Sequence, residues 1–140
     1  METRTVVRSF AIGVTCGMRS MTGPAVVRWR RKDPVRLALA ALGAGELIAD
    51  KLPATPARTI PPALIFRLFS GGFCGRSIAA ARDDDALGGT LAGSFGALAG
   101  AYAGQALRRL AVRASGLPDP FVALFEDAAA IAGAIAASGN

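Results

Sequence analysis

The sequence predicts an all-α fold: a polytopic helical membrane protein, one domain over residues 1–140, with four to five short transmembrane helices and a broken or re-entrant N-terminal segment. Hydrophobic residues make up 52% of the chain, and the mean hydropathy is +0.41. Residues 86–107 run for 22 positions without a charge, enough to cross a hydrocarbon core of about 30 Å. A buried helix of a soluble all-helical domain is the alternative for this stretch, but it lacks the polar stripe of a surface helix.

The N-terminal segment, residues 5–27, contains a predicted helix break. Its uncharged part has only ten residues and is followed by Arg19 and then by Gly23 and Pro24. Because glycine and proline at this spacing interrupt a helix, we expect a break between residues 17 and 24, with Arg19 directed at carboxylates. The segment is then either one kinked span or two half-helices that enter the membrane and return. The re-entrant form places eight basic residues on one side against five on the other, a modest cytoplasmic preference.

Start and stop signals predict four further helices, near residues 34–50, 60–81, 86–113 and 120–138. Asp33 and Asp119 each precede a proline, which suits an N-cap followed by the first helical position. Thr59 has a similar role for the second of these helices. Asp85 is placed to cap the third, and Gly116 to end it.

Glycines recur at every fourth position of several predicted helices, at 13 and 17, at 71 and 75, at 89 and 93, and at 96, 100 and 104. This spacing lets helix backbones approach closely in lipid, where no hydrophobic force drives helices together. We expect most of these stripes to pack within the chain and one to form the face of a homodimer.

Several kinds of chemistry are excluded or disfavoured by composition. The chain has no histidine, which removes histidine bases, triads and histidine metal ligands. Cys16 and Cys74 are far apart without a CxxC motif, so two buried thiols or one disulfide are the alternatives. We interpret Asp83, Asp84 and Asp85 as a solvated turn with a helix cap rather than a cation site. No catalytic residue, metal or cofactor is therefore expected.

The basic balance of the chain does not indicate nucleic acid. Lysine and arginine number 16 against ten acids, giving a net charge of +6. The charges come in short clusters between long uncharged stretches, and no aromatic-rich basic face accompanies them. The expected partner is the lipid bilayer.

Ionisable side chains nevertheless fall within the predicted spans, at Arg19, Glu46, Asp50, Arg67, Arg76, Glu126 and Asp127. Each costs about 2.5–3.5 kcal/mol at a helix centre, so such groups face a partner or a wet cavity. Glu46 and Asp50 share one helix face, and the proline-rich turn at 53–62 is expected to bring Lys51 and Arg58 over them. The candidate substrate-binding or pathway residues are Arg19, Thr22, Glu46, Asp50, Arg58, Arg67, Glu126 and Asp127.

Four stretches, "GMRSMTGPAVV" (17–27), "GELIADKLPATPARTIPPAL" (45–64), "RLFSGGFCG" (67–75) and "GLPDPFVALFEDAAAI" (116–131), carry a family resemblance. In them the chain resembles the small bacterial membrane proteins called domain of unknown function number 4126. The resemblance implies an integral membrane protein and points to these stretches as the important ones. It implies no particular activity.

These observations lead to two functional hypotheses for a multi-pass protein of the bacterial inner membrane. The first is a small transporter or channel-like protein with a charged intramembrane site for a small solute or ion. The second is a non-transporting scaffold or interaction protein whose buried ion pairs are structural. An enzyme acting on a lipid phosphate comes third, because no nucleophile–base pair is evident.

Overall fold

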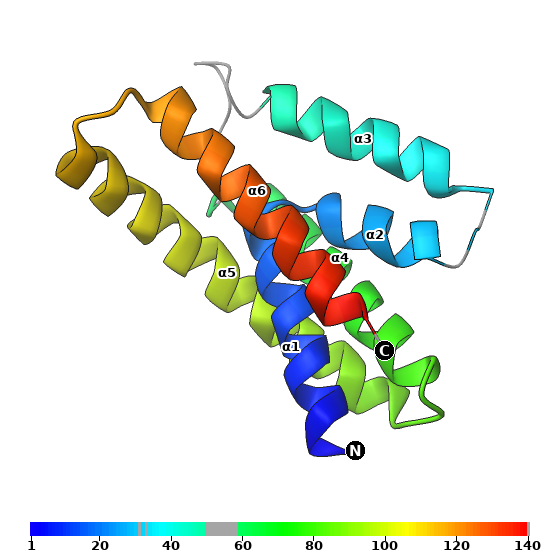
Figure 1. Ribbon diagram of the computed structural model, residues 1–140. Helices are drawn as coiled ribbons and strands as arrows, with labels where there is room; N and C mark the ends of the chain where they lie inside the picture. The colour runs from blue at the N-terminus through cyan, green and yellow to red at the C-terminus, as the bar shows by residue number, and fades with distance from the viewer. Residues whose placement is uncertain (31, 33, 50–58, 140) are drawn as a thin grey trace.

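The computed structural model describes residues 1–30, 32, 34–49 and 59–139. These residues form six helices, which confirms the all-α prediction (Figure 1). The helices are α1 (Thr3–Met18), α2 (Thr22–Arg30), α3 (Arg36–Ala49), α4 (Pro61–Ala80), α5 (Ala86–Ser115) and α6 (Asp119–Ser138).

The helix break lies where the sequence predicted it. Helix α1 ends at Met18 and α2 begins at Thr22, so the break falls inside the expected interval. The backbone N–H of Arg19 still donates to the carbonyl of Thr15 at 2.8 Å and closes the last turn of α1. Gly23 and Pro24 belong to the first turn of α2, where a proline needs no helical hydrogen-bond partner.

The predicted ends of α5 are confirmed. The Asp85 carboxylate accepts a hydrogen bond from the N–H of Leu87 at 3.0 Å, and Gly116 takes the left-handed conformation at φ 66°. The helix predicted near residues 60–81 is confirmed as α4, but the role predicted for Thr59 at its start is wrong, because the N-cap residue is Ile60 and no side chain caps it. The hydroxyl of Thr59 instead lies 3.4 Å from the side-chain oxygen of Gln105 on α5.

The other two predicted start signals have different outcomes. Helix α6 begins at Asp119 itself, one residue earlier than expected, with Pro120 at its second position. Asp33 lies outside the described residues.

Helices α1, α4 and α5 form the centre of the bundle, while α6 lies across α1 and α2, and α3 packs on the outer side of α2 (Figure 1). Glycines allow the central backbones to touch. A Cβ built on Gly93 would lie 2.1 Å from the carbonyl oxygen of Gly71, and one on Gly100 would lie 2.1 Å from that of Val14. Most glycine stripes therefore pack within the chain, as expected, and the homodimer face stays a prediction.

We expect Gly93→Ala to lower the free energy of unfolding by about 1–3 kcal/mol. The three atoms nearest to the new methyl group would all be backbone atoms of α4, so this helix would have to move away. Gly45→Ala is the matched control. A Cβ there meets nothing within 4 Å, so the change should stabilise α3 by about 0.5–1 kcal/mol. Thermal unfolding in detergent measures both. Equal effects of the two substitutions would contradict the close helix packing.

The prediction of four to five transmembrane helices is wrong. Among the helices that the structure describes, only α6 is long and apolar enough to cross a membrane, with a mean hydropathy of 1.6 over 18 residues. Helices α1, α2 and α3 have 16, nine and 14 residues, which is too short. Helices α4 and α5 are long enough, but glycine and arginine reduce their hydropathy. A multi-pass topology is not supported.

Helix α6 is nevertheless unlike the core helix of a soluble protein. Only 33% of its apolar window is buried inside the bundle. Its large side chains, including Phe121, Leu124 and Phe125, are exposed on the outer surface, whereas its buried face is mostly alanine.

Candidate functional site

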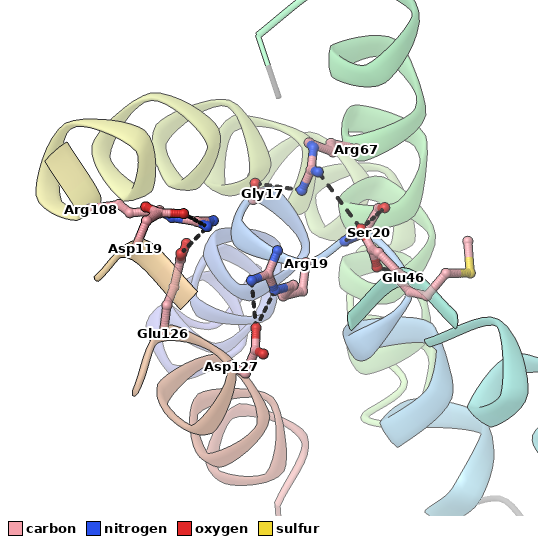
Figure 2. Close-up of polar contacts among 10 residues, drawn as sticks. Gly17, Arg19, Ser20, Glu46, Arg67, Arg108, Asp119, Glu126 and Asp127 are labelled. Atoms are coloured by element: carbon pink, nitrogen blue, oxygen red, sulfur yellow. Dashed lines mark hydrogen bonds and ion pairs between the residues drawn. The ribbon is translucent and has the colours of Figure 1, made fainter. Parts of the chain in front are cut away.

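The break between α1 and α2 leaves backbone carbonyls without helical partners, and side chains of α4 bind them. The guanidinium of Arg67 donates from Nη1 to the carbonyl of Gly17 at 2.9 Å. The hydroxyl of Ser70, one turn further along α4, donates to the carbonyl of Ser20. Figure 2 shows the Arg67 guanidinium directed at Gly17.

The free backbone N–H groups of the same break bind one carboxylate, that of Glu46 on α3. The N–H groups of Ser20 and Met21 donate to its two oxygens, each at 2.8 Å. The Ser20 hydroxyl donates to Oε1 as well, and Arg67 Nη2 lies 3.7 Å from this oxygen. Glu46 therefore caps the start of α2 from another helix, and Arg67 supplies the opposite charge (Figure 2).

Arg19 occupies the break itself and points at α6. Its Nε donates to Asp127 Oδ1 at 2.6 Å, and its Nη2 lies 2.5 Å from the same oxygen. The whole residue is 0% exposed. The expectation that Arg19 faces a carboxylate is confirmed, and the pair ties α6 to the break (Figure 2).

A second charged cluster lies where α5 and α6 meet. Arg108 binds both oxygens of Asp119, at 2.9 Å from Nε and 2.6 Å from Nη2. Its Nη1 lies 3.7 Å from Glu126 Oε2. Figure 2 shows this cluster apart from the group around Arg19 and Glu46.

The structure thus divides the predicted site. Arg19 with Asp127, and Glu46 with Arg67, meet around the helix break, whereas Glu126 joins the cluster at Arg108. Thr22 is buried, and its N–H donates to the Arg19 carbonyl at 3.3 Å. Asp50, Lys51 and Arg58 lie outside the described residues, as do residues 53–58 of the expected turn over Glu46, whereas Pro61 and Pro62 form the start of α4.

Three residues of these clusters were missed from the sequence: Ser20, Ser70 and Arg108. Arg108 had a usable signal. It precedes Asp119 across the short turn between two helices, and Glu126 follows Asp119 by seven residues on the same helix face. Ser70 had none, because a serine within an apolar helix most often bonds its own backbone. Ser20 lies in the break between α1 and α2, and no local pattern marks its long-range pairing with Glu46.

The acidic turn before α5 has the structural role that the sequence predicted. Asp85 caps α5. The Asp84 carboxylate accepts the N–H groups of Glu2 at 2.8 Å and Asp85 at 2.7 Å, which hold the pKa of Asp84 below its usual range. In the described part of the chain, no three His, Cys, Asp or Glu side chains are grouped to hold a metal ion. Cys16 and Cys74 are buried free thiols.

No family model, curated protein or solved structure matches this chain. The resemblance to domain of unknown function number 4126 therefore stays a prediction, and the interpretation of the site depends on its geometry.

We expect Asp127→Asn to lower the free energy of unfolding by about 3–5 kcal/mol, because it leaves the buried Arg19 charge without compensation. The double variant Arg19→Gln/Asp127→Asn should recover most of this loss. Asp119→Asn is the matched control: the Asp119 side chain is 55% exposed, so its loss should cost at most about 1 kcal/mol. Thermal unfolding in detergent measures all three. A double variant that is less stable than Asp127→Asn alone would contradict this prediction, because it would show that Arg19 stabilises the fold by contacts other than its ion pair with Asp127.

Proposed function

We propose that this chain is a bacterial membrane protein held in lipid by α6 and by the apolar exterior of its bundle, and that it acts as a non-transporting scaffold. In this proposal the internal charges hold helices in place. The observation that carries it is the inverted distribution of side chains, with arginine inside and phenylalanine outside.

The inversion is large at particular positions. Arg19 is 0% exposed, whereas Phe69 is 76% and Phe125 is 72% exposed. Exposed large apolar side chains also occur on α3 and α5, for example Leu42 and Phe95. In water each square ångström of such surface costs about 25 cal/mol, and contiguous patches are uncommon on soluble monomers. Lipid tails remove this cost.

The scaffold hypothesis is favoured over the transporter because the described charges around the break are already used by protein groups. Both oxygens of Glu46 accept backbone N–H groups. Arg67 binds a backbone carbonyl and Arg19 binds Asp127. A solute or ion that entered here would have to displace the bonds that satisfy the helix break, at a cost of about 1–3 kcal/mol for each buried polar group.

The membrane part of the proposal is tested by extraction. The protein expressed in a bacterium should stay in the membrane pellet after alkaline carbonate washing and enter solution only with detergent. The apolar exterior described above is the reason. Recovery of a soluble monomer without detergent would refute membrane integration.

The scaffold part is tested by ion flux. Proteoliposomes containing the wild-type protein should be no leakier to protons or K⁺ than protein-free vesicles, measured with a pH-sensitive dye and an ionophore control. The folded double variant Arg19→Gln/Asp127→Asn should behave identically. Flux through the wild type that the double variant abolishes would establish the transporter instead.

A further inference from the structure

We propose that the outer face of α4 binds one anionic diacyl phospholipid, with its phosphate between Arg28 and Arg76 and its acyl chains along the phenylalanines. This inference depends on the proposed location in a membrane.

The first feature is an open groove of about 600 Å³ between α4 and α5. Its walls are apolar for most of their length and include Ile65, Phe69 and Phe73 on α4. These three side chains are exposed to 53%, 76% and 37%. Arg76 lies at the end of the groove nearer the turn between the two helices. The groove therefore offers an apolar channel that ends in a cation.

The second feature is an open groove of about 370 Å³ between the same phenylalanines of α4 and residues of α2 and α3. Phe69 and Phe73 line both grooves and separate them. Arg28 lines this second groove, and its guanidinium lies 5.1 Å from the centre of the Phe73 ring. Each groove thus has an arginine at its Phe73 end and apolar side chains beyond it.

The third feature is the cation at the end of the first groove, Arg76. Arg76 is exposed and forms no ion pair with any residue that the structure describes. Of the nearby hydroxyls, that of Thr90 donates to the Ala86 carbonyl and that of Ser94 to the Leu68 carbonyl. A guanidinium on an apolar surface binds the phosphate of a lipid with charge-assisted hydrogen bonds.

Two cations beside two apolar grooves match a ligand with one anionic head and two hydrocarbon chains. A second copy of this chain is a poorer occupant, because the exposed carboxylates of the described residues lie at helix starts and in the turn before α5 rather than along an apolar helix face. Inorganic phosphate would use the arginines but leave the phenylalanines exposed.

The test uses the full chain purified in a neutral detergent, with phosphatidylglycerol and phosphatidylcholine of identical acyl chains. Native mass spectrometry should show one bound phosphatidylglycerol, preferred over phosphatidylcholine by about tenfold in apparent affinity. Arg76→Gln, and more fully Arg28→Gln/Arg76→Gln, should abolish this preference. The matched control Arg113→Gln removes an exposed arginine from the last turn of α5 and should retain it.

A second variant probes the acyl chains. Phe69→Ala removes a wall shared by both grooves and should weaken both lipids equally, leaving the preference intact. Equal binding of the two lipids by the wild type, or an unchanged preference in the double arginine variant, would overturn the lipid site. A change of oligomer mass in Arg76→Gln would likewise overturn it in favour of an interface between copies. Each of these outcomes leaves membrane integration, judged by carbonate extraction, unaffected.

Discussion

The interruption between α1 and α2 exposes backbone N–H and C=O groups inside the bundle, and these groups determine which side chains surround it. Unpaired, each would cost about as much as a lost buried hydrogen bond. Glu46 from α3 binds the N–H groups, and Arg67 and Ser70 from α4 bind the carbonyls. Helices α3 and α4 are thus both hydrogen-bonded to the backbone at the interruption between α1 and α2.

The close packing of glycines is what brings these partners within reach. A Cβ on Gly17 would lie 2.2 Å from the Ala97 carbonyl oxygen, and one on Gly71 would lie 2.5 Å from that of Gly93. With α1, α4 and α5 in backbone contact, a side chain as short as that of Ser70 can bind the Ser20 carbonyl. Larger residues at these positions would separate the helices and leave the break unsatisfied.

Local features of the fold could be predicted from the sequence, whereas its long-range pairings could not. The break before Gly23, the cap at Asp85 and the stop at Gly116 depend on neighbouring residues only. The choice of Asp127 for Arg19 depends on how α6 crosses the bundle, which no spacing encodes. The predicted count of transmembrane helices is wrong because stretches such as residues 86–107 lack charge but are rich in glycine, which adds little hydropathy.

The ion pairs have a clear origin once the break is considered. A buried pair is rarely more stabilising than well-packed apolar side chains, so stability alone does not explain it. Here the carboxylate of Glu46 is needed for N–H groups that no apolar side chain can satisfy, and its burial then requires the Arg67 cation. Arg67 in turn binds the Gly17 carbonyl. The Glu46–Arg67 pair thus follows from the interrupted backbone, which is why we interpret it as structural rather than as a path for a solute.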